Sequence, residues 1–156
     1  MRKQFFKYII IPLVFLFVAI QFFHPDKNNG ELKLAPFFAD TNASPEVVTI
    51  IKKACIDCHS NKTNYPWYSN IAPLSFKISA HIIEAKEELN FSEWKSYSVK
   101  KKDHKLEEII EVLDEKEMPL QSYLLMHNEA RLSKEQVEIL KKWAITKRKN
   151  YQQRLK

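Results

Sequence analysis

Two thiols and an imidazole lie within five residues of this chain, in the run Cys55-Ile56-Asp57-Cys58-His59. These are the only two cysteines of the sequence. Cys-x-x-Cys-His is the signature at which haem is attached covalently as haem c. The two thiols add to the vinyl groups on one edge of the porphyrin, and the adjacent imidazole reaches the iron as an axial ligand. On a helix, residues three and four apart share a face, so both sulfurs and the imidazole can address one ring. The motif therefore predicts haem c on Cys55 and Cys58, with His59 as a metal ligand.

Three other uses of the motif remain open. Structural zinc normally takes four ligands, usually from two clusters, and the chain has no second cysteine pair, so His81, His104 or His127 would have to supply the fourth ligand. A thioredoxin-like redox pair is expected in a βαβ context, and strand signals are scarce here. A plain structural disulfide is the third alternative.

The N-terminus combines positive charge with an apolar run. Arg2, Lys3 and Lys7 lie at its start, and the segment from Tyr8 to Phe23 is almost free of polar side chains. A helix from Phe5 to Phe23 would be about 28 Å long, close to the roughly 30 Å of a bilayer's hydrocarbon core. The run ends in Gln-Phe-Phe-His-Pro rather than in the small residues of a signal-peptide cleavage site. We therefore expect residues 1–23 to be an uncleaved membrane anchor, with a cleaved signal sequence as the alternative.

The charge pattern sets the expected location. Positive charges on the short N-terminal side favour leaving that side in the cytoplasm. The chain is then expected to be a single-pass protein of the bacterial inner membrane, with its haem-binding domain facing the periplasm. Nucleic acid is excluded as a partner of such an exported domain, and a redox partner protein in or at the membrane is expected instead.

The rest of the chain is predicted to be all-α. Residues 24–43, which include His24-Pro-Asp-Lys-Asn-Asn-Gly30, are expected to form a polar linker. Residues 44–156 are expected to form one small haem-binding domain. Gly30 is the only glycine, whereas a β-rich fold with tight hairpins normally needs several.

Helix signals divide this domain. Ser44 followed by Pro45 predicts a helix start, and the apolar stripe after it ends at the two cysteines. A second helix is expected over residues 74–89, and a third around 106–113. Ser133 with Gln136 three residues later forms a capping box, which predicts the start of a last helix.

The Cys-x-x-Cys-His motif supplies one axial ligand of the iron but does not specify the second. Met118 directly precedes Pro119 at the end of the third predicted helix. A thioether ligand there would give His/Met ligation, which raises the reduction potential and suits electron transfer. We therefore predict Met118 as the sixth ligand, and the competing side chains are His81, His104, Met126 and His127.

Charge is unevenly distributed around a formal net charge of +6. The last sixteen residues hold seven bases and no acid, while acidic residues precede Met118, from Glu107 to Glu117. Either cluster is compatible with a solvated helix face. If Met118 binds iron, the acidic cluster lies near the haem and could steer a basic partner.

These residues together resemble a known pattern. Class I cytochromes c have a capped helix ending in Cys-x-x-Cys-His, a later Met-Pro and a C-terminal helix with an aromatic residue. The match is closer to the small haem-binding domain family of bacterial membrane-anchored c-type cytochromes, through residues 55–73, 117–123 and 127–143. The resemblance implies a cytochrome c-like helical fold, haem c on Cys55 and Cys58, His59 as proximal ligand and Met118 as distal ligand. The first helix departs from the class I pattern because it has neither glycine nor an aromatic residue.

The expected function is that of a membrane-anchored monohaem cytochrome c that carries single electrons in the periplasm, rather than that of an enzyme. The alternative is a haem-based sensor or peroxidase-like protein with an open or displaceable sixth iron site. A hydrolase is not indicated, because no Ser-His-Asp pattern or paired carboxylate motif is present.

Overall fold

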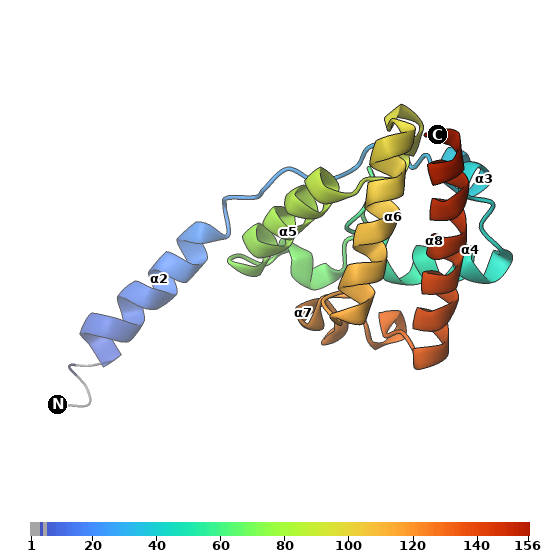
Figure 1. The fold of residues 1–156 in the computed structure, drawn as a ribbon. Coiled ribbons are helices and arrows are strands. Elements are labelled where there is room, and N and C mark those ends of the chain that lie inside the picture. The colour runs from blue at the N-terminus through green and yellow to red at the C-terminus, as the bar shows by residue number, and fades with distance from the viewer. Residues whose placement is uncertain (1–3, 5) are drawn as a thin grey trace.

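The structure is a computed structural model that describes residue 4 and residues 6–156. Arg2, Lys3 and Phe5, which contribute to the predicted anchor, lie outside the described residues. Within this part, the chain forms seven α-helices and no strands, so the all-α prediction is confirmed (Figure 1). The helices are α2 (Ile11–Ile20), α3 (Ala35–Thr41), α4 (Pro45–Ala54), α5 (Leu74–Glu88), α6 (Val99–Asp114), α7 (Gln121–Leu124) and α8 (Lys134–Arg154).

Four shorter helical turns complete the fold. A π-helical turn, Phe6–Ile10, runs directly into α2. Three 3₁₀ turns lie between the longer helices, at Trp67–Asn70, Phe91–Ser96 and Asn128–Ala130. They connect the elements around the cysteine motif.

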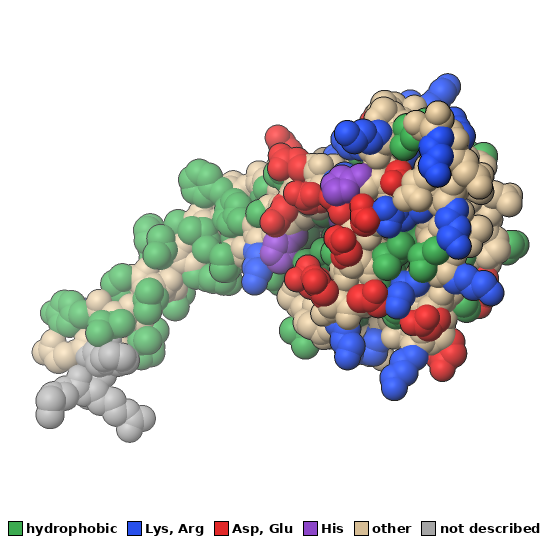
Figure 2. Space-filling model, in the orientation of Figure 1, with side chains coloured by type: hydrophobic (Ala, Val, Ile, Leu, Met, Phe, Trp, Pro, Cys, Tyr) green, Lys and Arg blue, Asp and Glu red, His purple; other side chains and the backbone are tan. Residues whose placement is uncertain are grey.

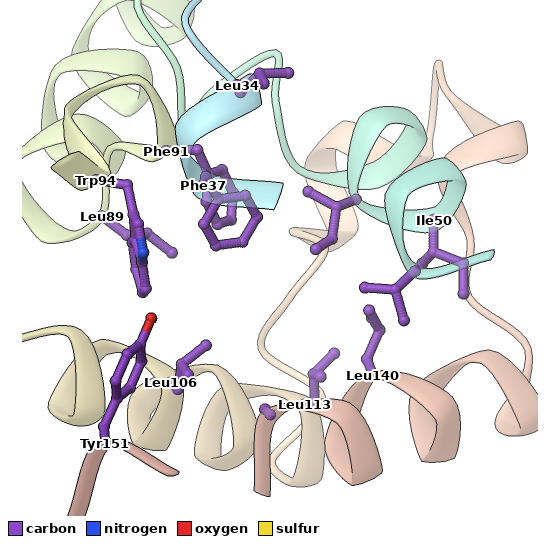
Figure 3. Packing of buried hydrophobic residues seen from close by; sticks show 13 residues of the cluster. Leu34, Phe37, Ile50, Leu89, Phe91, Trp94, Leu106, Leu113, Leu140 and Tyr151 are labelled. Carbon is purple, nitrogen blue, oxygen red and sulfur yellow. The ribbon is translucent and has the colours of Figure 1, made fainter. Parts of the chain in front are cut away.

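The core lies between α4, the pair α6 and α8, and the segment Phe91–Ser96. Helices α6 and α8 run side by side in Figure 1 and make the most extensive helix–helix contact of the domain. Figure 3 shows Ile50 of α4 facing Leu140 of α8. Helix α4, which has neither glycine nor an aromatic residue, thus packs against α8 through aliphatic side chains. The small, fully buried Ala144 of α8 belongs to the same cluster.

Serine caps define where the main helices begin. Ser44 accepts a hydrogen bond from the backbone N–H of Val47, at 3.3 Å. The predicted capping box is present, because Ser133 Oγ accepts from Gln136 N and Gln136 Oε1 accepts from Ser133 N. Each cap satisfies backbone donors that the first helical turn would leave without partners.

The segment expected to be a linker differs from the prediction. Residues 24–43 contain α3, and Leu34, Phe37 and Thr41 of this stretch are buried. Phe37 packs against Phe91 and Trp94, with ring centroids 4.6 and 4.9 Å apart. The polar residues before Gly30 dominated the sequence pattern, whereas apolar side chains after it join the core, so the domain begins before Ser44.

The carboxylate of Asp40 in α3 connects three distant parts of the domain. Its Oδ2 accepts hydrogen bonds from Trp94 Nε1 at 3.0 Å and from the Tyr151 hydroxyl at 2.6 Å, and it pairs with Lys102 Nζ at 3.0 Å. Trp94 and Tyr151 are fully buried. Burial raises the pKa of Asp40, but the hydrogen bonds from Tyr151, Lys102 and Trp94 outweigh it and lower the pKa below its ordinary value.

The N-terminal helix projects from the domain (Figure 1). Most side chains of α2 are exposed, including Phe15 at 75%, and none is buried. The single helix predicted over residues 5–23 is instead a π-helical turn followed by α2, which ends at Ile20. Among the described residues, no helix is both long enough and apolar enough to cross a membrane.

We predict that Asp40→Asn lowers the free energy of unfolding by about 2 kcal/mol, because two buried donors lose a charged acceptor. Chemical denaturation at neutral pH measures this change. The folded-state pKa is lowered, so the stability that Asp40 contributes is present above the unfolded pKa and is lost as the pH falls through the folded pKa. The difference between wild type and Asp40→Asn should therefore shrink below about pH 4. The exposed carboxylate variant Glu87→Gln serves as the control and should show neither effect.

Candidate functional site

The cysteine motif continues the last turn of α4. The backbone N–H of Cys55 donates to Ile51 O at 3.0 Å, and the N–H of His59 donates to Cys55 O at 3.0 Å. The chain thus stays coiled through the motif although α4 ends at Ala54. Both cysteines are free thiols of intermediate exposure. The two thiols and the imidazole are therefore carried on one compact turn.

His59 is held by the segment that follows α5. Its Nδ1 lies 3.0 Å from the carbonyl oxygen of Leu89, and the N–H of Phe91 donates to the His59 carbonyl at 2.9 Å. A carbonyl can only accept, so Nδ1 carries the proton and Nε2 carries the lone pair. Burial lowers the pKa of His59, against the opposing effect of hydrogen bonds to Leu89 and Ala85. The imidazole is thus neutral, which is the form that binds a metal.

Met118 is positioned by the way α6 ends. Lys116 adopts a left-handed backbone with φ 59°. The N–H of Lys116 donates to Leu113 O at 3.4 Å, and that of Glu117 donates to Val112 O at 2.9 Å. These two bonds form a Schellman motif, which terminates the helix sharply. Met118 follows immediately, so the turn directs the chain from α6 toward the cysteine motif.

Three adjoining cavities surround the motif. One of about 220 Å³ is lined by Cys55, Cys58, His59 and Met118 together. A second, of about 450 Å³, shares Cys55, His59 and Met118 with it and extends along α6. A third, of about 330 Å³, shares Cys58 and extends toward α7. The structure thus brings the four predicted site residues to one continuous cleft.

The competing axial ligands are placed differently. His81 of α5 lines two of the cavities, including the one that holds Met118. Both ring nitrogens of His127 are engaged, Nε2 with the Tyr68 hydroxyl at 2.6 Å and Nδ1 with Glu129 at 3.1 Å. His104 is exposed on α6 and lines none of the three cavities. Met126 is 57% exposed at the outer end of the third cavity. His81 is therefore the strongest competitor of Met118.

Asp57, between the two cysteines, ties the motif to its surroundings. Its Oδ2 accepts a hydrogen bond from the Tyr123 hydroxyl at 3.0 Å, and its Oδ1 accepts one from Asn64 N at 3.3 Å. Tyr123 stacks in turn on the His127 ring, with centroids 4.1 Å apart. Sequence reasoning singled out the cysteines and the histidine but gave Asp57 no role. The Cys-x-x-Cys-His signature leaves this position free, so only its tertiary partners reveal its function.

The thiols lie in an apolar setting. Burial, followed by the neighbouring Cys58, raises the pKa of Cys55 to about 12. Burial, followed by the charge of Asp57, raises the pKa of Cys58 to about 11. Both thiols are thus protonated at neutral pH. Among the described residues, no group of three or more His, Cys, Asp or Glu side chains could hold a metal ion by itself.

Acidic side chains border the cleft on the α6 side. Glu88, Glu108, Glu111, Glu115 and Glu117 all line the cavity that extends along α6. Figure 2 shows acidic side chains gathered on this side of the domain. The nearly buried Lys105 pairs with Glu108 at 2.7 Å and with Glu88 at 3.7 Å, and so offsets part of this charge. Met118 lines the same cavity as these acidic side chains.

The bases of the C-terminal segment are partly used inside the fold. Arg148 of α8 contacts Asp103 at 3.1 Å and Glu107 at 2.8 Å, both on α6. Lys141 pairs with Asp114 at 2.6 Å. These ion pairs join α8 to α6, so they leave fewer free positive charges than the sequence alone indicates.

Residues 15–146 match the family described as the haem-binding domain. The chain belongs to the haem-binding domain family. The match covers most of the chain, including the motif, Met118 and the first part of α8. No curated protein and no solved structure matches the chain significantly.

The residues of this haem-binding domain suit the cofactor that the family binds. Two free thiols, a neutral imidazole with its Nε2 lone pair available and a thioether line one cavity. Imidazole and thioether are common axial ligands of haem iron. Aliphatic and aromatic side chains provide much of the remaining wall, as a porphyrin ring requires.

We predict that Tyr123→Phe lowers the free energy of unfolding by about 1–2 kcal/mol, because the Asp57 carboxylate loses a hydrogen bond. Thermal unfolding of the haem-loaded protein measures the change. Ser122→Ala, at the exposed neighbouring position, is the control and should leave the melting temperature unchanged. Equal stability of Tyr123→Phe and wild type would show that this contact does not hold the motif.

Proposed function

We propose that this haem-binding protein is a membrane-anchored monohaem c-type cytochrome that transfers single electrons outside the cytoplasm. The observation that carries the proposal is the common cavity of Cys55, Cys58, His59 and Met118. Two thiols beside an oriented imidazole are the set that covalent attachment of haem c needs. Cys55 and Cys58 would hold the porphyrin edge, and His59 and Met118 would be the axial ligands.

When bound, haem supplies a one-electron couple whose potential His/Met ligation raises. The residues of the chain orient and shield this group. The carbonyl of Leu89 fixes the tautomer and direction of the His59 ring. The Schellman turn at Lys116 presents Met118, and apolar side chains of α4, α5 and α6 limit access of water. With His59 and Met118 both bound to the iron, no iron position would be left open for a substrate, which favours an electron carrier over an enzyme.

The N-terminal segment supports a membrane location. The side chains of α2 are apolar around the whole helix, and none is buried by the domain. An apolar segment of this kind is stabilised in a bilayer rather than in water. Residues 1–23 would form a single-pass anchor in the bacterial inner membrane, with the domain facing the periplasm. The acidic border of the cleft would then attract a basic redox partner at the membrane.

Covalent attachment is tested by staining for haem after denaturing electrophoresis, with the protein expressed beside a cytochrome c maturation system. Wild type should retain haem, and Cys55→Ala/Cys58→Ala should lose it entirely, because no other thiol is present. His104→Ala, a surface change on α6, is the control and should stain like wild type. Haem that leaves the wild-type chain on denaturation would contradict thioether attachment, while haem binding by the family would still hold.

The sixth ligand is tested with Met118→Ala. Loss of the thioether should abolish the six-coordinate low-spin ferric spectrum and lower the reduction potential, within the roughly 0.8 V range that axial ligands span. The matched control is Met126→Ala, which removes an exposed methionine of the same cleft. A spectrum that survives Met118→Ala but changes in His81→Ala would assign the ligand to α5. A wild-type iron that is five-coordinate would instead favour the sensor or peroxidase-like alternative.

A further inference from the structure

The end of the apolar N-terminal helix is hydrogen-bonded to the domain. Gln21 follows α2 and forms a reciprocal pair with the backbone of Ala72. Gln21 Nε2 donates to Ala72 O at 3.0 Å, and Ala72 N donates to Gln21 Oε1 at 2.9 Å. A third bond, from Gln21 Nε2 to Phe17 O at 2.9 Å, fixes the same amide to α2 itself. The helix and the loop before α5 are therefore joined through one side chain.

The chain after Gln21 is attached to the domain again at Lys27 and Asn28. Lys27 Nζ donates to Asn70 Oδ1 at 2.8 Å. Asn28 N donates to the Tyr65 hydroxyl at 2.7 Å, and Asn28 Oδ1 accepts from Lys86 Nζ at 2.7 Å. These bonds hold residues 21–28 against the loop and α5. The segment that connects the helix to the domain is thus hydrogen-bonded to the domain surface rather than free in solvent.

Exposed apolar side chains lie beside the point of attachment. Ile71 directly precedes Ala72 and is 39% exposed, while Leu74 and Phe76 follow it and are 42% and 41% exposed. Trp67, in the 3₁₀ turn of the same loop, is 73% exposed. We refer to these four residues as the loop patch. In Figure 2 the hydrophobic surface of the N-terminal helix continues onto the adjoining edge of the domain.

We propose that the loop patch rests in the headgroup region of the same bilayer that holds the N-terminal helix. This inference rests on the proposed membrane anchor. Gln21 lies near the end of the apolar run, so in the proposed anchor it is close to the boundary between hydrocarbon and water. The hydrogen bonds between Gln21 and Ala72 place the loop patch, which consists of Trp67, Ile71, Leu74 and Phe76, at the same depth in the bilayer as Gln21.

The chemistry of the patch fits a lipid surface. Tryptophan is enriched at membrane–water interfaces, where an apolar ring with one polar N–H is stabilised. Lys27 and the exposed Lys77 lie next to the patch and can reach anionic headgroups. Leu74 also lines the cavity that contains Cys58 and Tyr123. The outer end of the haem cleft would thus be held close to the membrane, where a membrane-bound electron donor or acceptor could approach it.

The test uses the full chain with haem attached, reconstituted in vesicles of phosphatidylcholine and phosphatidylglycerol. Ile71→Cys and Phe76→Cys are each labelled with a nitroxide and measured with the iron reduced. The thioethers would occupy Cys55 and Cys58, leaving the introduced thiol as the only one that reacts. Ile145→Cys is the matched control, since Ile145 is 42% exposed and belongs to α8, which lies on the side of the domain away from α2 in Figure 1. The readout is the ratio of label accessibility to oxygen, which concentrates in lipid, and to a water-soluble nickel complex.

The expected result is a ratio severalfold higher at positions 71 and 76 than at 145. Adding Gln21→Ala to Ile71→Cys should bring the ratio at 71 down toward that at 145, with the protein still floating with the vesicles. Equal accessibility ratios at 71, 76 and 145 in vesicle-bound protein would contradict the contact between the loop patch and the lipid headgroups, while the proposed anchor would still hold. Protein that fails to float with vesicles would contradict the proposed anchor, and with it the contact between the loop patch and the membrane.

Discussion

The hydrogen bond between His59 Nδ1 and the carbonyl of Leu89 is the contact on which the site depends. It fixes which imidazole nitrogen is available to iron, and it joins the motif to the segment after α5. Phe91 in that segment donates its N–H to the His59 carbonyl and packs against Phe37. The orientation of the metal ligand is therefore set by the hydrophobic core and not by the motif alone.

The same core explains why α3 belongs to the domain. Phe37 and Asp40 lie on this short helix, and Asp40 collects hydrogen bonds from Trp94 and Tyr151. Through these contacts, α3, the segment after α5 and the end of α8 constrain one another. A small domain with few buried residues gains from such shared partners, because each one orders several segments at once.

The motif is held on its other side by α7. Asp57 accepts a hydrogen bond from Tyr123, and the Schellman turn at Lys116 brings Met118 to the cavity of the thiols. On the N-terminal side, Gln21 attaches the apolar helix to the loop that follows the motif. The haem cleft, the acidic border and the N-terminal helix thus have defined relative positions. In the function we propose, this arrangement would set how a partner at the membrane reaches the haem.

Local signals in the sequence determined the helical class, the serine caps at Ser44 and Ser133, and the candidate ligands, because caps and ligand motifs depend on residues close together in the chain. Tertiary structure alone decided that residues 34–41 pack into the core, because their apolar side chains find partners about fifty residues away. It also placed His81 in a cavity with Met118 and left His127 and His104 outside both cavities that contain Met118, since the availability of a ligand depends on long-range packing. The role of Asp57 appears only in its contact with Tyr123, sixty-six residues later in the chain. Spacing specifies which residues can do chemistry, whereas the fold decides which of them meet.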